Sequence, residues 1–310
     1  MSTEIHVAAC CDENYVAYAG VMMHSAIQAT PGATLHFHLI NCSIRDESVD
    51  TLRTMLEAMG ARLTTYTPDA SLYEGLPTLR YGEAVYQRIN LPEYIPESID
   101  KIIYIDSDTL VLQSLMELWT LDLQGNSTGA VENLSPKACQ DIGVDRTEYF
   151  NSGVLVMDLN QWRQRRLHRQ VTDYARENAA GLRFVDQCSL NAVLQGDWFR
   201  LPLKWNQQSD IYKVVVKYQE GCSYSVDEMQ SAMLEPAIVH FTGKMKPWKL
   251  YCFHPFKSCY RKVLAQTPWA GQPYPDADFN TRLRFLFALR RHWKFHARRQ
   301  QLADRFQGKS

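Results

Sequence analysis

Two aspartates directly follow a short apolar run in the first half of the chain. The run covers residues 102–105, and Asp106, Ser107 and Asp108 come immediately after it. Ligands of open α/β sheets bind beyond the carboxyl ends of the strands. Two carboxylates at positions i and i+2 can converge there on one hard cation, such as Mg²⁺ or Mn²⁺, which typically holds substrate phosphates. Aspartates are also common in ordinary turns, so the pair alone leaves that alternative open.

A second group of residues with chemical potential extends from His240 to Trp248. It contains an imidazole, a glycine (Gly243) and two lysines, the second of which is Lys246. A glycine lets the backbone approach a ligand closely, and lysine ammonium groups neutralise phosphate oxygens. The alternative interpretation is an exposed loop that carries a structural histidine and a core tryptophan.

Polar side chains also stand beside two further expected elements. Asn151 and Gly153 come just before the apolar run 154–157, where small and amide residues could bind sugar hydroxyls or form a tight turn. Asp186 and Gln187 stand at the start of an expected helix. Asp186 is either part of a ligand pocket or simply the N-cap of that helix.

The elements that must position these residues alternate in a β-α-β rhythm. Expected strands are residues 5–9, 35–40, 62–66, 102–105 and 154–157. Expected helices are residues 18–30, a helix capped by Ser43 and Asp46 and ended by Gly60, residues 160–178 with Asn160 as cap, and residues 186–194. This order predicts an α/β fold with a parallel sheet and helices on both of its faces.

Composition and charge narrow the class of protein. The chain has 310 residues, 45% of them hydrophobic, and a formal net charge of −1. These values exclude a chain that is basic overall, as many nucleic-acid binders are, and an acidic disordered one. Residues 281–310 nevertheless carry nine Lys and Arg and one acid, which gives this segment a charge of +8 and leaves −9 for the rest. Such asymmetry predicts a tail with a separate task.

The cysteines and the apolar segments indicate where the protein resides. Eight cysteines form no CxxC pair, which argues against a zinc site and favours small core residues. The N-terminus has no basic region followed by an apolar run, so we expect no secretory signal. No stretch of 18 apolar residues exists that would span a membrane. Together these features favour free thiols in a reducing compartment.

The basic tail has an imperfect amphipathic pattern. Arg284, Arg291, Arg298 and Arg305 recur every seven residues and would share one stripe of a helix. The apolar residues of the neighbouring arc are Leu283, Leu286, Trp293 and Ala297, and Arg290 falls within it. Trp293, Phe295 and Phe306 could insert at a lipid headgroup boundary. The alternatives are a solvated tail and an RNA-binding tail.

The motifs taken together resemble a known family. In order along the chain, the residues that carry the resemblance are Ala8 to Tyr15, Tyr86-Gln87-Arg88, Asp106-Ser107-Asp108, Tyr149 to Gly153, Asp186-Gln187 and His240 to Trp248. This set is similar to glycosyltransferase family 8, and within it to the bacterial lipopolysaccharide α-galactosyl- and glucosyltransferases. The resemblance implies a GT-A nucleotide-sugar transferase fold, which is a Rossmann-like mixed sheet flanked by helices, here followed by a helical basic tail.

The resemblance also implies roles for individual residues. Asp106, Asp108 and His240 would bind Mn²⁺, with Mg²⁺ as a substitute, at the diphosphate of a UDP-sugar. Ala8, Asp12 and Asn14 match positions around uracil and ribose, and Arg88, Asp106 and Ser107 match the donor sugar and phosphate site. Asn151, Gly153, Asp186 and Gln187 match the hexose pocket, and Gly243 and Lys246 match the diphosphate clamp. Asp186 and Gln187 are the candidate catalytic residues.

The expected activity is therefore transfer of galactose or glucose from UDP with retention of configuration. The acceptor would be a saccharide of the lipopolysaccharide core or a related lipid-linked saccharide, on the inner face of the plasma membrane. We accordingly expect a cytoplasmic, peripheral protein with a catalytic domain at 1–265, a connector at 266–280 and a membrane-associating tail at 281–310, and no nucleic-acid partner. Front-side attack and a covalent intermediate both stay open. The rival classes are a non-catalytic nucleotide-sugar-binding protein and a membrane scaffold.

Overall fold

The computed structural model describes residues 3–69, 72, 74–76, 83–134, 139–212, 222–285 and 287–288. The strands are β1 (Thr3–Cys11), β2 (Ala33–Asn41), β3 (Arg62–Tyr66), β4 (Lys101–Ile105), β5 (Thr109–Val111), β6 (Thr128–Glu132), β7 (Phe150–Asp158), β8 (Trp198–Arg200), β9 (Gln207–Gln208) and β10 (Ile238–His240). The α-helices are α1 (Val16–Ala29), α2 (Asp46–Ala58), α3 (Leu91–Tyr94), α4 (Met116–Thr120), α5 (Leu159–Gln164), α6 (Leu167–Glu177), α7 (Val185–Val193), α9 (Val226–Leu234) and α10 (Lys257–Leu264). Short 3₁₀ helices are η2 (Glu83–Tyr86), η3 (Gln140–Ile142), η4 (Arg146–Glu148), η5 (Ala179–Gly181) and η6 (Leu203–Asn206).

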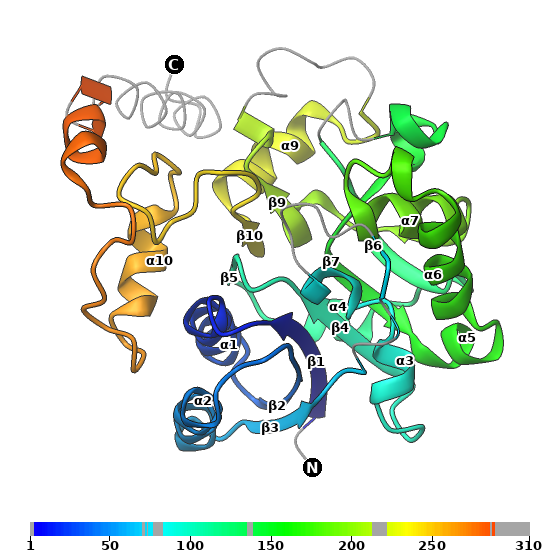
Figure 1. The fold of residues 1–310 in the computed structure, drawn as a ribbon, viewed down its shortest axis with the longest axis horizontal. Coiled ribbons are helices and arrows are strands. Elements are labelled where there is room, and N and C mark those ends of the chain that lie inside the picture. Colours follow the sequence, from blue (N-terminus) through cyan, green and yellow to red (C-terminus); the bar gives the residue numbers. More distant parts are fainter. Residues whose placement is uncertain are drawn as a thin grey trace.

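A seven-stranded mixed sheet forms the centre of the protein (Figure 1). Its strand order is β3-β2-β1-β4-β7-β6-β8. The β1-α1-β2-α2-β3 segment and β4 are parallel, as the β-α-β rhythm predicts. The second half departs from the parallel arrangement, because β7 runs antiparallel to both β4 and β6. β6 and β8 pair in parallel and run in the same direction as β4, so β7 is the one reversed strand of this sheet. The prediction of a parallel sheet is therefore wrong at β7, and the mixed sheet implied by the family resemblance is correct.

Hydrophobic side chains cover both faces of this sheet. Alternate residues of β1, such as Ile5 and Val7, pack with α1 and α2 on one face. On the other face, Ile102 and Tyr104 of β4 pack in a second core with residues of α5, α6 and α7, including Trp162. This two-sided burial explains why the strands read as continuous apolar runs in the sequence. It leaves the polar residues that follow each strand at the open edge of the sheet.

A small three-stranded sheet lies at that edge and joins distant parts of the chain. Its order is β5-β10-β9, with β10 antiparallel to β5 and parallel to β9. Val21 of α1, Val239 and Phe241 around β10, and Tyr260 of α10 form its core. This sheet fixes the position of the segment that begins at His240.

The predicted strands are present, and each of those at residues 5–9, 35–40, 102–105 and 154–157 extends beyond its predicted bounds. Two cap assignments are wrong. Ser43 does not cap α2: it has a φ of 69°, and the residue at the cap position is Arg45. The cap of α5 is Asp158, whose carboxylate accepts a hydrogen bond from the backbone of Gln161, and Asn160 is inside the helix.

The predicted helix at 160–178 is two helices, α5 and α6, which Arg166 separates by its left-handed backbone (φ 53°). The predicted stop at Gly60 is correct, since its φ of 78° suits a helix end. All eight cysteines are free thiols, and four of them are buried. Within the described ranges, no helix has the length and apolar character needed to cross a bilayer.

The segment after residue 265 packs onto the preceding part of the chain. A Cβ on Gly20 of α1 would overlap the ring of Trp269. Asp276 accepts hydrogen bonds from the backbone of Leu250 and Tyr251. Most of the expected tail falls outside the described residues, including Leu286, Arg290, Arg291, Trp293, Lys294, Phe295, Ala297, Arg298, Arg299, Arg305 and Phe306.

Candidate active site

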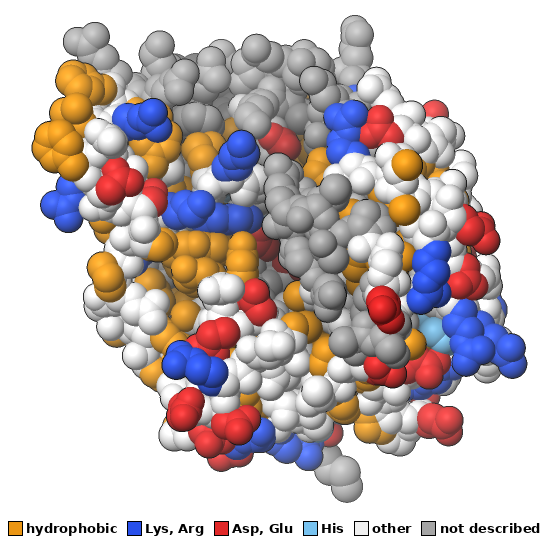
Figure 2. All heavy atoms as spheres, in the orientation of Figure 1, with side chains coloured by type: hydrophobic (Ala, Val, Ile, Leu, Met, Phe, Trp, Pro, Cys, Tyr) orange, Lys and Arg blue, Asp and Glu red, His pale blue; other side chains and the backbone are white. Residues whose placement is uncertain are grey.

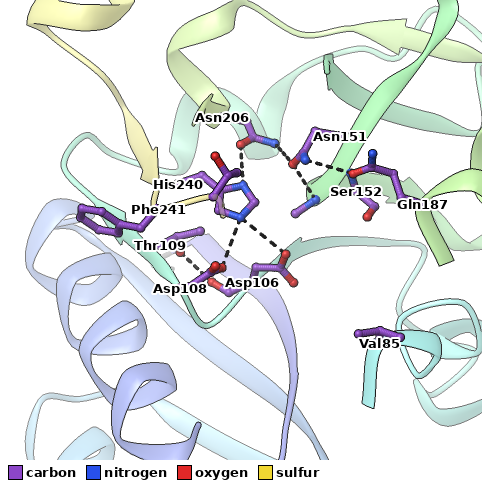
Figure 3. Close-up of polar contacts among 12 residues, drawn as sticks. Val85, Asp106, Asp108, Thr109, Asn151, Ser152, Gln187, Asn206, His240 and Phe241 are labelled. Atoms are coloured by element: carbon purple, nitrogen blue, oxygen red, sulfur yellow. Dashed lines mark hydrogen bonds and ion pairs between the residues drawn. The ribbon is translucent and has the colours of Figure 1, made fainter. Parts of the chain in front are cut away.

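Strand register brings the two aspartates and the histidine together. β10 pairs antiparallel with β5 so that His240 lies opposite Thr109, and the backbone N–H of Phe241 donates to the carbonyl of Asp108. Nε2 of His240 is 3.2 Å from Oδ1 of Asp108 and 3.8 Å from Oδ2 of Asp106. Figure 3 shows the imidazole between the two carboxylates. Residues that are 132 positions apart in sequence thus form one cluster of three side chains that could hold a metal ion.

Lys246 supplies a positive charge beside this cluster. Its ammonium group donates to the Asp108 carboxylate and to the carbonyl of Phe241. Burial alone would raise the pKa of Asp108, but Lys246 and His240 hold that pKa well below its usual range. Asp108 is therefore a carboxylate, the form that binds cations.

A chain of hydrogen bonds fixes the orientation of His240. The backbone N–H of Gly153 donates to Oδ1 of Asn151 at 3.0 Å, which makes this atom an acceptor. Asn206 then donates its Nδ2 to the same oxygen at 2.8 Å, so that its own Oδ1 faces Nδ1 of His240 at 2.9 Å. Nδ1 of His240 must donate to this oxygen, which leaves Nε2 with a free lone pair in the neutral ring.

The cluster fits a divalent metal by the chemistry of its donors. Two carboxylates and one imidazole nitrogen suit Mn²⁺, because imidazole favours later ions than Mg²⁺. The bond from Nδ1 to Asn206 is the outer contact that metal-binding histidines typically make, and it presents Nε2 to the two aspartates.

Gly153 leaves the room that this cluster occupies. It lies in β7, and its carbonyl accepts a hydrogen bond from the backbone of Asp106 at 2.8 Å. A Cβ at this position would overlap Cε1 of His240 and lie 2.8 Å from Oδ2 of Asp106. The motif is therefore part of the strand itself, and the alternative of a tight turn before the strand is wrong.

We predict that Gly153→Ala lowers the affinity of this cluster for a divalent cation and slows any reaction at the cluster by about 10²-fold, since a displacement of about 1 Å in a site costs that much. Metal titration and steady-state kinetics would measure the two effects. Gly181→Ala is a matched control, because a Cβ there meets nothing within 4 Å. Equal behaviour of the two variants would contradict the packing argument.

Arg88 connects the metal cluster to α7. Its guanidinium is buried, lies 3.0 Å from the Asp106 carboxylate and 3.2 Å from the Asp186 carboxylate, and donates to the carbonyl of Ser152 at 2.8 Å. The ring of Tyr104 lies 4.6 Å below it, and the Tyr104 hydroxyl donates to Asp106 at 2.7 Å. Arg88 thus connects the end of β4, strand β7 and helix α7 through one charged side chain.

Asp186 and Gln187 point from the first turn of α7 toward β7. The cap residue of α7 is Phe184, so the alternative role of Asp186 as N-cap is wrong. Asp186 instead accepts a hydrogen bond from the Ser152 hydroxyl at 3.1 Å. Gln187 accepts from Nδ2 of Asn151 at 3.0 Å and from the backbone N–H of Ser152 at 3.2 Å. Burial raises the pKa of Asp186, and Arg88 opposes that shift.

The other predicted site residues are spread around this centre. Ser107 is buried between the two aspartates. Asp12 and Asn14 lie in the loop after β1, where Asn14 donates to the Asp12 carboxylate at 3.2 Å. Gly243 has a left-handed backbone (φ 79°) and open space around its Cα. Ala8 is fully buried within β1, so its side chain presents no surface to a ligand.

Three residues near the centre were not predicted from the sequence. Asn206 and Tyr104 hydrogen-bond to His240 and Asp106, respectively, as described above. Tyr15 is 39% exposed and packs edge-on against Trp248, which in turn stacks on Tyr18 at 3.6 Å. The sequence contained a signal for one of these three residues, because Tyr15 is an aromatic residue inside the segment that resembles the nucleotide-binding motif. It contained no comparable signal for Asn206 or Tyr104.

Solved structures share this architecture. A crystal structure of the galactosyltransferase LgtC in complex with donor and acceptor sugar analogues matches with a TM-score of 0.77 and 25% identity, covering 85% of this chain and 96% of that one. The fold is accordingly the GT-A glycosyltransferase fold.

The chain belongs to glycosyl transferase family 8, whose sequence profile matches residues 6–252. General stress protein A of Bacillus subtilis (strain 168) is 29% identical over 272 residues, which cover 86% of this chain and 94% of that protein. Lipopolysaccharide 1,2-glucosyltransferase of Escherichia coli (strain K12) is 26% identical over 88% of this chain and 81% of that protein. The protein is therefore a glycosyltransferase, as the resemblance of its motifs implied.

Proposed function

We propose that this protein is a Mn²⁺-dependent, retaining hexosyltransferase that uses UDP-galactose or UDP-glucose. The acceptor is a saccharide of the lipopolysaccharide core or a related lipid-linked saccharide. The observation that carries the proposal is the cluster of Asp106, Asp108 and His240, with the Lys246 ammonium beside it at the edge of the sheet. Relatives described as lipopolysaccharide glucosyl- and galactosyltransferases support the choice of acceptor and sugars.

The leaving group of the reaction is a UDP diphosphate, which gains negative charge as the bond to the sugar breaks. Asp106, Asp108 and His240 would hold Mn²⁺, which when bound stabilises this charge. Lys246 lies against Asp108 and is the protein's own cation for the same purpose. Gly243, whose surroundings are open, lets the backbone of this loop approach the phosphates.

The donor sugar would lie against α7 and β7. Asn151, Asp186 and Gln187 present amide and carboxylate oxygens that can stabilise positive charge on the sugar ring. We favour front-side attack by the acceptor over a covalent intermediate. Arg88 and the Ser152 hydroxyl both contact Oδ2 of Asp186, and Gln187 Oε1 already accepts two hydrogen bonds, so these two oxygens are already engaged as acceptors.

The nucleoside would lie over the loop that follows β1. Asp12 and Asn14 offer polar groups for ribose and uracil at this place. Tyr15 adds an exposed ring, and aromatic rings of this kind stack on bases. We therefore extend the proposed nucleotide site to Tyr15 and treat Ala8 as a support beneath it.

The C-terminal segment is proposed to bind the inner face of the plasma membrane, in a cytoplasmic protein. Phe279 and Phe287 are each 79% exposed and Leu283 is 43% exposed, at a spacing of four residues that places them on one helix face. Arg282 and Arg284 flank them. Figure 2 shows hydrophobic and basic side chains gathered at the upper left, where Figure 1 draws this segment. Such a combination is typical of helices that lie in a lipid interface.

We predict that a chain ended after Ala288 binds anionic vesicles about a hundredfold more weakly than the full chain. Seven of the nine basic residues of the tail are then lost. Each contributes about 1 kcal/mol to binding near an anionic surface, so the loss of half of these contributions is enough for a hundredfold change in affinity. This end point retains the Asp276 contacts and the stacking of Phe285 on Phe253. Vesicle co-sedimentation measures binding, and donor hydrolysis in solution should be unchanged. Equal binding by both chains would contradict a membrane role for residues 289–310.

The activity itself is tested by a panel of UDP-sugars. We expect Mn²⁺-dependent release of UDP from UDP-galactose or UDP-glucose, and NMR of the product should show an α-linkage. A non-catalytic binding protein would bind the donor without releasing UDP. Release from a different UDP-sugar alone would overturn the assignment of the donor while leaving the transferase class intact.

A further inference from the structure

Three histidines form a second cluster on the central sheet, away from the Asp106 site. His6 on β1 pairs directly with His36 on β2, and His38 follows two residues later on the same face. One ligand nitrogen from each lies within 4.8 Å of the others. The closest pair is Nδ1 of His6 and Nε2 of His38, at 3.1 Å. Adjacent strands thus present three imidazoles to one point.

This cluster is separate from the proposed donor site. β1 and β4 are in parallel register with Val7 opposite Ile103, so His6 is level with Ile102. Asp106 comes four residues further along, which corresponds to roughly 13 Å along the strand direction. No residue of the proposed reaction belongs to the histidine cluster, and the reaction gives no reason for it.

The outer nitrogens of two of these rings already have partners. Nδ1 of His38 is 2.9 Å from the Tyr66 hydroxyl, and Nε2 of His36 is 2.8 Å from the Thr64 hydroxyl. These contacts leave Nε2 of His38 and Nδ1 of His36 for a common ligand. Metal-binding histidines are held in the same way, by a hydrogen bond from the nitrogen that does not bind the ion.

The charges around the cluster permit a cation. Burial lowers the pKa of His6 to about 4 and that of His38 to about 3, in both cases with a further contribution from His36. Burial lowers the pKa of His36 as well, so all three environments favour the neutral imidazole, the form that offers a lone pair. The Glu4 carboxylate lies 3.5 Å from Nδ1 of His36 and also pairs with Arg62. The nearby Lys101 ammonium is bound by the carbonyls of Trp119 and Leu121.

We propose that His6, His36 and His38 form a binding site for a late first-row divalent cation, of which Zn²⁺ is the first to test. Three imidazole nitrogens suit Zn²⁺, and an oxygen of Glu4 or water completes a tetrahedral set. When the ion binds, the proton between Nδ1 of His6 and Nε2 of His38 moves to the outer nitrogen of the ring that carries it, Nε2 of His6 or Nδ1 of His38, so that the rings stay neutral. It joins β1 to β2 through side chains, in addition to their backbone ladder.

The test is Zn²⁺ titration of the full chain against a chromophoric chelator. Wild-type protein and Asp106→Asn should each bind one Zn²⁺ at the histidine cluster, because the substitution alters only the other cluster. His36→Gln should weaken this binding by more than about 100-fold, since loss of an outer partner alone costs about 10- to 100-fold. His36 is partly exposed, which makes it the least disruptive of the three to replace. A double variant, His292→Gln with His296→Gln, controls for the two histidines of the tail.

Unchanged Zn²⁺ affinity in His36→Gln, or no stoichiometric binding by Asp106→Asn, would overturn the proposal. Loss of binding only in the tail variant would overturn it as well. Circular dichroism must show that His36→Gln is folded. If it is not, the visible spectrum of Co²⁺ bound to Asp106→Asn decides: a four-coordinate, nitrogen-rich spectrum supports the site, and an octahedral oxygen spectrum rejects it.

Discussion

Replacement of Asp106 by Asn is expected to reduce sugar transfer by about 10²–10³-fold, the effect of removing one preorganised charge-stabilising group. Asp106 presents one carboxylate oxygen to Nε2 of His240, and the other accepts from Tyr104 and pairs with Arg88. An amide keeps the size of the side chain and can still accept both hydrogen bonds. The fold should therefore survive while the affinity for Mn²⁺ falls.

Three measurements separate a catalytic effect from a structural one. Thermal unfolding should change little, Mn²⁺ titration should show weakened binding, and UDP release should drop in parallel. Asp227→Asn is a matched control, since this exposed aspartate lies in the first turn of α9, outside the cluster. Full activity of Asp106→Asn with unchanged Mn²⁺ affinity would remove Asp106 from the metal site.

Replacement of Arg88 by Met is expected to destabilise the protein by about 3–5 kcal/mol, the usual cost of breaking a buried ion pair by removing one partner. Arg88 is 7% exposed and compensates two carboxylates, Asp106 and Asp186. Without it, the buried Asp186 and the partly buried Asp106 lose their compensating charge, in a setting where ionised groups are costly. For a chain of this size, the melting temperature should fall by roughly 10 °C.

Arg45→Met is the appropriate control for this prediction. Arg45 also pairs with a carboxylate, that of Glu13, but its side chain is 70% exposed. Solvent screens such pairs, so we expect little change in the melting temperature. Calorimetry on both variants tests the argument. A loss of stability that is equal in the two variants, or absent in Arg88→Met, would show that burial does not decide the strength of this pair.

The sequence predicted the parts of the site in which polar residues directly follow an apolar run that forms a strand. Asp106 and Asp108 follow a recognisable buried strand, and the segment from His240 also follows an apolar run, so both had to lie at an edge of a sheet. Their meeting depends on the pairing of β5 with β10, two strands of only three residues each. The family resemblance supplied that pairing, since the periodicity of such short strands could not.

The errors share a physical cause, which is tertiary contact that overrides local preference. Ser43 has the sequence pattern of a cap, yet the Glu13 carboxylate from the loop after β1 accepts from the backbone of Arg45 and from the Ser48 hydroxyl at the start of α2. Asn206 went unnoticed for the same reason. Its role depends on the position of β9, a strand of two residues that pairs with β10. It also depends on the hydrogen bond that the Asn206 amide donates to the side chain of Asn151 in β7.

The most direct test of the account is UDP release from UDP-galactose and UDP-glucose by the full chain, before and after removal of divalent metal. The account predicts that a chelator abolishes release from the preferred donor and that added Mn²⁺ restores it. Asp106→Asn should stay about 10²–10³-fold slower than the wild-type protein when Mn²⁺ is added. Release that persists in the presence of chelator, or that Asp106→Asn performs as well as the wild-type protein, would contradict a metal-assisted reaction at Asp106, Asp108 and His240.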